Sequence, residues 1–104
     1  AENVTAELSV RKYILSLVTA TRNSDYVKLG VSPRGSIALL KASKAYAFVQ
    51  GRGFVMPDDV KAVMPDVLAH RLMISLKGKS AFENEREALE NIALTVKSPD
   101  AIEK

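Results

Sequence analysis

The sequence predicts an all-α fold, a bundle of four to five helices, and two observations carry that prediction. Only five of the 104 residues are Gly and four are Pro, which favours long elements over strands joined by many tight turns. Strong helix formers fill stretches whose apolar residues recur with the helical period. Hydrophobic residues make up 47% of the chain and charged residues 26%, the balance of a folded globular domain.

Composition also excludes several classes of protein. The chain contains no Cys, which removes disulfide scaffolds, thiolate metal sites and cysteine nucleophiles and makes a cytoplasmic location the expectation. No apolar run approaches the roughly 18 residues of a membrane span, so membrane insertion is not expected. The net charge of +3 is too mild to argue for nucleic acid. Because no Met opens the chain, we expect residues 1–104 to be a single domain excised from a longer protein.

The first predicted helix covers residues 5–22, where one apolar stripe repeats with a period of about 3.6 residues. The stripe consists of Val10, Ile14, Leu17, Val18 and Thr21, and Tyr13 borders it. Residues 23–32 lack this period and are predicted to form a connecting loop. Three of the loop side chains are expected to fold onto the core: Tyr26, Val27 and Leu29.

The second helix has the clearest start signal in the sequence. Ser32 is a preferred N-cap residue, and Pro33 then takes the first helical position, where its missing N–H costs nothing. We expect this helix to end at Gly51, which suits the left-handed position that follows many helices. Its many Ala residues favour close approach to neighbouring helices, so it is the predicted central helix.

A third helix is predicted to begin at Pro57, because two acids follow the proline in the first turn. Pro65 is expected to break or kink this helix, and residues 66–72 to continue as a second short piece. One short extended segment is expected after Leu72.

The C-terminal part is predicted to hold one more helix. Residues 77–82 are expected to form a surface loop, and the last helix to cover residues 83–96. The ordered core is therefore expected at about residues 5–96, with residues 97–104 as a frayed tail.

Some motifs resemble chemical sites but fail on their spacing. Residues 78–80 read Gly-Lys-Ser, like the end of a phosphate loop, but Met73 stands where that motif needs a glycine. Residues 51–53 begin a dinucleotide fingerprint that is not completed. His70 is the only histidine, so no metal site is predicted, and a hydrogen bond in the core or between helices is its expected role, with Asp66 one turn before it.

The start of the second helix carries two residues that local rules do not explain. Arg34 lies where the helix end is already partly positive, which disfavours a cation by about 0.3–1 kcal/mol. Gly35 costs a further ~0.5–1 kcal/mol relative to Ala. A bound anion would explain both, because free N–H groups, a guanidinium and a missing side chain form a phosphate-sized niche. An ion pair between Arg34 and an acid on another helix is the alternative.

At these residues the sequence resembles the C-terminal lid of MoxR-family AAA+ ATPases. Matching blocks occur in the family's order and cover roughly residues 8–76. The blocks are Tyr13-Ile14 and Leu17-Val18 with Ala20-Thr21-Arg22, LGVSPRGS (29–36) with ALLKA (38–42), GRGFV (51–55) with PDDV (57–60), and VLAHRL (67–72).

This resemblance implies an AAA+ lid that packs on a preceding α/β ATPase core of the same chain and closes over ATP and Mg²⁺. It identifies Arg34 as the second-sensor arginine, which reaches the γ-phosphate. Ser32 and Pro33 are expected beside the nucleotide, and Tyr13 on the adenine side. The fragment alone is not an enzyme, because it has no phosphate loop or catalytic acids.

For the parent protein, the resemblance implies a ring, expected to be a hexamer, that remodels partner proteins in a chaperone-like way. Partners with von Willebrand factor A domains are expected. Gly35 stands in place of the usual alanine, and Met56 in place of a capping Thr or Ser. The second departure predicts a third helix less firmly capped, by about 1 kcal/mol.

Three alternatives stay open from the sequence. The lid of a magnesium-chelatase-type ATPase subunit would look the same over this segment. A DNA-binding module would use the basic residues Lys41 and Lys44 of the second helix, although Leu39 and Tyr46 make that helix too apolar to read a groove. In a plain interaction domain, Arg34 would be only structural.

Overall fold

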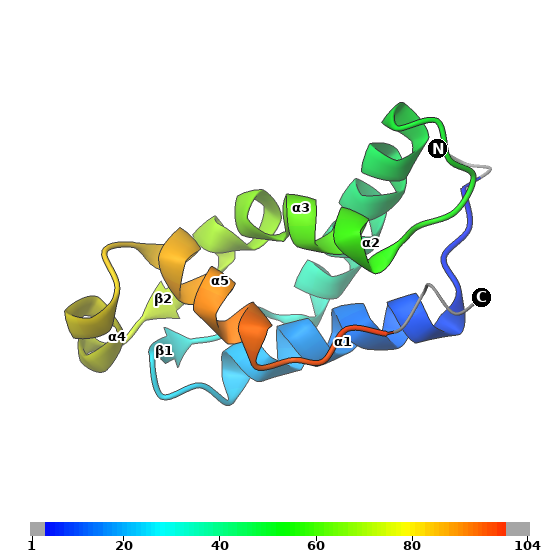
Figure 1. The fold of residues 1–104 in the computed structure, drawn as a ribbon. Helices are drawn as coiled ribbons and strands as arrows, with labels where there is room; N and C mark the ends of the chain where they lie inside the picture. The colour runs from blue at the N-terminus through cyan, green and yellow to red at the C-terminus, as the bar shows by residue number, and fades with distance from the viewer. Residues whose placement is uncertain (1–3, 100–104) are drawn as a thin grey trace.

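The computed structural model describes residues 4–99. Within that range the chain forms five α-helices, one 3₁₀ turn and a two-stranded sheet, which confirms the predicted all-α bundle (Figure 1). In chain order the elements are α1 (Leu8–Arg22), β1 (Val27–Leu29), α2 (Pro33–Val49), α3 (Pro57–Leu68), the 3₁₀ turn η1 (Ala69–Arg71), β2 (Met73–Ile74), α4 (Leu76–Ala81) and α5 (Glu85–Leu94).

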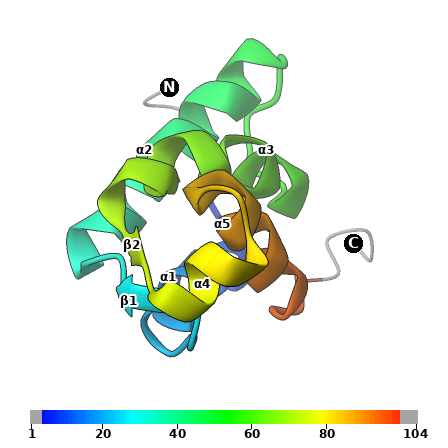
Figure 2. The ribbon, with the colours of Figure 1, turned by 90° about the vertical axis from the view of Figure 1, so that its left-hand side faces the viewer.

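The core lies between four of the helices. Each contributes one large side chain that is completely buried: Leu17 of α1, Leu39 of α2, Leu68 of α3 and Leu89 of α5. The α2 helix packs on α1 and α3, while α5 packs on the same two helices from the other side. The small sheet and α4 lie together at one end of the bundle (Figure 2).

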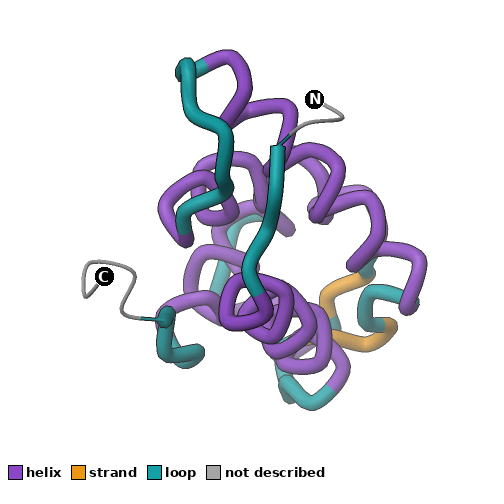
Figure 3. The backbone as a smooth tube through the Cα atoms, turned by 90° about the vertical axis from the view of Figure 1, so that its right-hand side faces the viewer, coloured by secondary structure: helices purple, strands orange, loops and turns teal. Residues whose placement is uncertain are grey.

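The α1 helix buries the whole predicted stripe together with Tyr13. It begins at Leu8, however, so the prediction that helix starts at residue 5 is wrong. The reason is a long-range contact: Thr5 donates its N–H to the Gly53 carbonyl at 3.0 Å and accepts from the Val55 N–H at 2.9 Å. The extended segment before α1 therefore runs beside the connection between α2 and α3 (Figure 3).

The segment between α1 and α2 is more regular than predicted. Part of it forms β1, which pairs antiparallel with β2 through Val27–Ile74 and Leu29–Met73. The extended segment expected after Leu72 is thus confirmed as β2. Val27 packs against the core, but Leu29 is 60% exposed, so the expectation that Leu29 folds inward is wrong. In a regular strand these two residues would point to the same face, but the pairing with β2 shifts register between them, and this irregularity breaks the alternation that would place Leu29 inward.

Tyr26, the remaining loop side chain, is half-buried. Its ring meets that of Phe82 edge to face, with 5.0 Å between the ring centroids.

Both predicted ends of α2 are confirmed. The helix begins at Pro33 after Ser32 in the N-cap position, although the Ser32 side chain makes no capping hydrogen bond. Gly51 follows the helix with φ = +84°, a left-handed conformation that glycine adopts without steric cost.

The α3 helix continues through Pro65 to Leu68, so the predicted break at Pro65 is wrong. Proline removes one helical hydrogen bond, but Pro65 is itself buried with Met64 and Leu68, and this packing stabilises the helix. After Leu68 the chain forms η1 rather than a second helical piece. His70 is exposed and makes no side-chain hydrogen bond within residues 4–99, and Asp66 forms an ion pair with Arg86, so the expected core or interhelix hydrogen bond of His70 is wrong.

The predicted surface loop at residues 77–82 is also wrong, because most of it forms α4. Ser75 caps this helix: its hydroxyl accepts from the Gly78 N–H at 3.1 Å and donates to the Asp25 carbonyl at 2.8 Å. Gly78 is buried, and a Cβ atom there would lie 2.2 Å from the Tyr26 carbonyl oxygen. Glycine is therefore required for this close approach.

The last helix is shorter than predicted. Asn84 caps α5 by accepting from the Glu87 N–H at 2.9 Å, and the helix ends at Leu94. Residues 97–99 of the predicted tail form no helix or strand, and residues 100–104 lie outside the described residues. No helix in residues 4–99 is long and apolar enough to cross a membrane.

Candidate functional site

Arg34 lies in the first turn of α2 with its side chain exposed. Within residues 4–99 it makes no side-chain hydrogen bond or ion pair. The three ion pairs found in that range join Arg52 to Asp59, Lys77 to Asp25 and Arg86 to Asp66. Among the described residues, the alternative that Arg34 pairs with an acid on another helix therefore finds no partner.

Ser32 and Pro33 are exposed beside Arg34. The backbone offers fewer free donors here than a helix start usually does, because Pro33 has no N–H and the Gly35 N–H donates to the Ser32 carbonyl at 2.8 Å. The Ser36 hydroxyl donates to the Pro33 carbonyl at 2.7 Å. Any anion at this site would be bound mainly by the Arg34 guanidinium rather than by backbone amides.

Gly35 faces the core instead of the solvent. A Cβ atom at this position would lie 2.1 Å from Cγ1 of Val31 and 3.6 Å from Cδ2 of Leu68. The missing side chain thus serves close packing between α2 and Val31. The expectation that Gly35 opens space for a phosphate is wrong, since Val31 takes that space.

The residues that precede α2 are tied to the end of α1. Thr21 accepts the Val31 N–H at 3.0 Å through its hydroxyl oxygen, and Arg22 donates from Nε to the Val31 carbonyl at 3.0 Å. A Cβ atom on Gly30 would lie 2.7 Å from Cα of Arg22, so the two backbones are in direct contact. Helical periodicity predicted Thr21 as a core residue but gave no indication of this contact with Val31.

Tyr13 is 3% exposed and lies in the core of the bundle. Its Oη atom has no hydrogen-bond partner within residues 4–99. Burial raises the pKa of the Tyr13 hydroxyl above its ordinary value, and the negative charge of Asp58 adds to that shift. A contact between Tyr13 and adenine stays a prediction, and the burial of the ring does not support it.

A second polar cluster fastens the connection between α2 and α3. Arg52 donates to both carboxylate oxygens of Asp59, at 2.5 and 2.6 Å, and Asp59 also accepts the Met56 N–H at 2.7 Å. Burial alone would raise the pKa of Asp59, which is 1% exposed, but these hydrogen bonds outweigh it and hold the pKa below its ordinary value. The sequence suggested only a favourable helix-start charge for Asp59.

Met56 lies in the N-cap position of α3 and makes no side-chain capping bond. The hydrogen bond from its N–H to Asp59 supplies part of what a capping Thr or Ser would have supplied.

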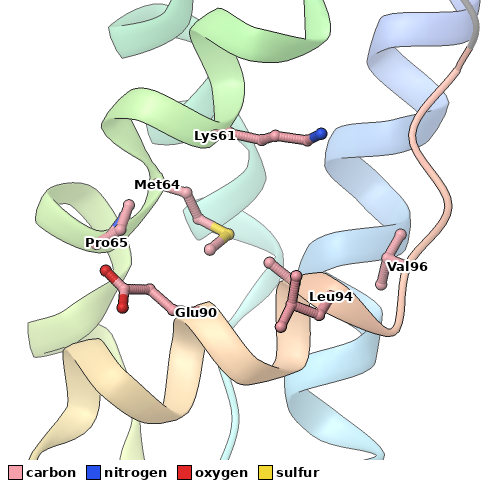
Figure 4. Close-up of a pocket in the computed structure, with 7 residues that line it drawn as sticks. Lys61, Met64, Pro65, Glu90, Leu94 and Val96 are labelled. Atoms are coloured by element: carbon pink, nitrogen blue, oxygen red, sulfur yellow. The ribbon is translucent and has the colours of Figure 1, made fainter.

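Several hollows lie on the surface of the bundle. One, of about 320 Å³, opens between α3 and α5, with Lys61 and Glu90 at its rim and Met64, Leu94 and Val96 along its wall (Figure 4). The lining is apolar and brings no set of polar groups together. Metal binding has no support either, because residues 4–99 contain no cluster of three or more acidic or histidine side chains.

Another hollow, of about 230 Å³, lies between α1 and α2. Leu15, Ile37 and Leu40 form its apolar lining, and Leu15 and Ile37 are each 56% exposed. Ile37 stands three residues, or about one helical turn, after Arg34 on α2. Apolar surface therefore lies within about a turn of the candidate arginine.

Known proteins resemble this chain along most of its length. The family described as AAA lid domain matches residues 19–92. YeaC of Bacillus subtilis is 42% identical over 98 residues, which make up 94% of this chain and 31% of YeaC. Protein MoxR of Paracoccus denitrificans is 39% identical over 97 residues, 81% of this chain and 27% of that protein.

Two further similarities extend this comparison. Chaperone MoxR1 of Mycobacterium tuberculosis is 39% identical over 72 residues, 61% of this chain and 19% of that protein. The crystal structure of a "putative ATPase" from Cytophaga hutchinsonii matches with a TM-score of 0.84 and 32% identity, over 95% of this chain and 33% of that one. The chain thus spans about a third or less of the length of each of these proteins.

Proposed function

This chain belongs to the AAA lid domain family, and from that membership we propose that it is the nucleotide-sensing lid of a MoxR-type AAA+ ATPase. Its similarity to Protein MoxR and to Chaperone MoxR1 agrees with the family resemblance of the Ser-Pro-Arg segment. Hydrolysis of ATP with Mg²⁺ belongs, in this proposal, to the parent protein, whose α/β core precedes the lid in the same polypeptide.

The observation that carries the proposal is the position of Arg34. Its guanidinium is exposed in the first turn of α2 and has no partner within residues 4–99, while the backbone behind it is fixed to α1. A guanidinium carries several N–H donors in a fixed plane, which suits the oxygens of a phosphate group. To bind a phosphate from outside the lid, a guanidinium must be free of partners within the lid and must be held on a rigid element, and Arg34 meets both conditions.

In this proposal, Arg34 binds the γ-phosphate when ATP is present and loses that contact after hydrolysis. A charge-assisted hydrogen bond is worth about 1.5–3 kcal/mol, so its loss would shift the balance between closed and open lid by roughly 10- to 100-fold. Lid closure would thereby report whether the γ-phosphate is present.

For the whole protein we propose chaperone-like remodelling of partner proteins by a cytoplasmic ring, expected to be a hexamer. The similarity to Chaperone MoxR1 supports the chaperone part of this proposal. Partners with von Willebrand factor A domains, and the alternative of a magnesium-chelatase-type parent, remain predictions of the family resemblance.

The test compares Arg34→Ala and Arg34→Lys in the full-length protein. We expect Arg34→Ala to lower ATP turnover and to weaken binding of a non-hydrolysable ATP analogue while binding of ADP changes little, because only the former carries a γ-phosphate. Arg34→Lys keeps the charge but loses the fork of donors, so it should restore only part of the activity. Unchanged turnover and unchanged preference for the triphosphate in Arg34→Ala would reject the sensor role.

A further inference from the structure

We propose that Thr21, in the last turn of α1, is a positioning residue for Arg34. This inference rests on the proposed sensor function and adds a residue to it that does not touch the nucleotide. It begins from the hydrogen bonds of the Thr21 hydroxyl, which is 1% exposed. The hydroxyl donates to the Val18 carbonyl at 2.6 Å and accepts from the Val31 N–H at 3.0 Å.

The hydroxyl of Thr21 is oriented by the first of these bonds so that its lone pairs are available for the second. Val31 is fully buried, so its N–H has no access to water. A buried donor without a partner is strongly disfavoured, and Thr21 supplies that partner from a different element of the fold. The position of Val31 is therefore coupled to the position of α1.

Val31 is also fixed on two other sides. Its carbonyl accepts from Nε of Arg22 at 3.0 Å, and its Cγ1 atom occupies the space where Gly35 would carry a Cβ atom. The residue is thus held by the end of α1 and packs directly against the first turn of α2. Any shift of Val31 changes how α2 begins.

Only Ser32 and Pro33 separate Val31 from Arg34, and the proline ring fixes one of the intervening backbone angles. The direction in which the Arg34 side chain leaves α2 is therefore set by where Val31 is held. A guanidinium that must meet one phosphate group depends on this direction, since a displacement of about 1 Å is enough to cost a large part of such an interaction.

The experiment uses the full-length protein and three threonine variants. Thr21→Val keeps the shape of the side chain but removes the hydroxyl, and Thr21→Ser restores the hydroxyl. Thr19→Val is the matched control, because Thr19 lies on the exposed face of the same helix and makes no side-chain hydrogen bond within residues 4–99. The readout is the ratio of the dissociation constants for ADP and for a non-hydrolysable ATP analogue.

We expect Thr21→Val to lower the preference for the triphosphate by about 3- to 10-fold, the equivalent of one net hydrogen bond. Thr21→Ser and Thr19→Val should stay within about 2-fold of the wild type. In a background that already carries Arg34→Ala, Thr21→Val should have no further effect on this ratio, because it acts through the arginine. A general loosening of the lid would instead weaken both nucleotides alike.

The outcomes separate the two proposals. If Arg34→Ala leaves the ratio unchanged, the sensor function fails, whatever Thr21 does. If Arg34→Ala lowers the ratio but Thr21→Val does not, the sensor stands and the positioning role of Thr21 is wrong. The same holds if the two effects are additive.

Should Thr21→Val fail to fold, Arg22→Ala replaces it, since Arg22 is exposed and its loss removes the other hydrogen bond to Val31. An unchanged ratio in Arg22→Ala would then overturn the inference.

Discussion

Replacing Asp59 with Asn tests whether the ion pair with Arg52 fastens the connection between α2 and α3. The substitution keeps the shape of the side chain and one carbonyl oxygen, so the hydrogen bond from the Met56 N–H can survive. It removes the charge that Arg52 meets at 2.5 and 2.6 Å, and it turns an –NH₂ group toward the guanidinium. Two donors then face each other at a position that is 1% exposed.

The expected loss of stability depends on this geometry. Breaking a fully buried ion pair typically costs 3–5 kcal/mol, and about 2–4 kcal/mol is expected here because the Arg52 side chain is 27% exposed and can be hydrated. For a chain of this size, each kcal/mol corresponds to about 4–8 °C in melting temperature. Asp59→Asn should therefore lower the melting temperature of the 104-residue chain by at least about 8 °C, as followed by circular dichroism.

Asp58→Asn provides the control. Asp58 is the exposed neighbour of Asp59 in the same first turn of α3, and it forms no ion pair within residues 4–99. Its charge favours the helix start by about 0.3–1 kcal/mol at most. A drop in melting temperature as large as that of Asp59→Asn would mean that the helix dipole, and not the ion pair with Arg52, explains the effect.

The pH dependence gives a second, independent test of the ion pair. The folded-state pKa of Asp59 is lowered, so the charged carboxylate stabilises the fold at pH values above the unfolded-state pKa, near 4. This contribution is lost as the pH falls through the lower, folded-state pKa. The difference in melting temperature between wild type and Asp59→Asn should hence be full at about pH 7 and shrink below about pH 4. A difference that stays constant down to about pH 3 would refute this reasoning.

Two further substitutions test the packing of the lid. Gly78→Ala should lower the free energy of unfolding in urea by more than about 1 kcal/mol, because the added Cβ would meet a backbone oxygen of Tyr26. Gly53→Ala is the control, since open space surrounds Gly53, and it should not have this effect. Equal effects of the two substitutions would contradict the close approach at Gly78. Tyr13→Phe should leave the free energy of unfolding within about 0.5 kcal/mol of the wild type or raise it, because the Tyr13 hydroxyl has no hydrogen-bond partner within residues 4–99. A clear loss of stability in urea would reveal a hydrogen bond to that hydroxyl.

The elements that the sequence predicted correctly are those whose signals are local. Ser32, Pro33 and Gly51 mark the two ends of α2 because capping and left-handed backbone depend on a few neighbouring residues. The stripe of α1 is visible because a long helix repeats its period several times. The α4 helix, with only six residues, repeats it hardly at all, and a single serine such as Ser75 is a weak start signal without a period behind it.

The parts that escaped prediction depend on contacts between distant segments. Thr21 meets Val31 across a turn and a strand, and Thr5 meets Gly53 across two helices, so neither contact leaves a periodic trace in the sequence. Gly35 shows how local reasoning can mislead. Its cost inside a helix suggests a ligand, whereas the structure explains it by the side chain of Val31.

These distant contacts bear on how a sensor at Arg34 would act on the rest of the lid. The α2 helix has 17 residues and is therefore about 25 Å long. It is fastened at its start by the hydrogen bonds to Val31 and, just past its end, by the ion pair between Arg52 and Asp59. A rotation of α2 would therefore be passed on to the elements that are joined to its two ends. If α2 pivots near Arg34 by roughly 10°, a helix of that length displaces its far end by about 4 Å.

That far end projects from the bundle (Figure 1) and carries two exposed apolar side chains, Phe48 and Val49, and a third, Phe54, follows in the connection to α3. The largest displacement would thus fall on the apolar surface farthest from the arginine along α2. Loosening the Arg52–Asp59 pair should weaken the transfer of this motion from α2 to α3 without altering how Arg34 meets the phosphate. In the full-length protein, Asp59→Asn is therefore expected to leave the preference for ATP over ADP within about 2-fold of the wild type while uncoupling nucleotide binding from motion at Lys61, an exposed residue of α3. A fluorescent label placed at Lys61 would detect the uncoupling, and a nucleotide-dependent signal of unchanged size would show that the Arg52–Asp59 pair does not carry motion from α2 to α3.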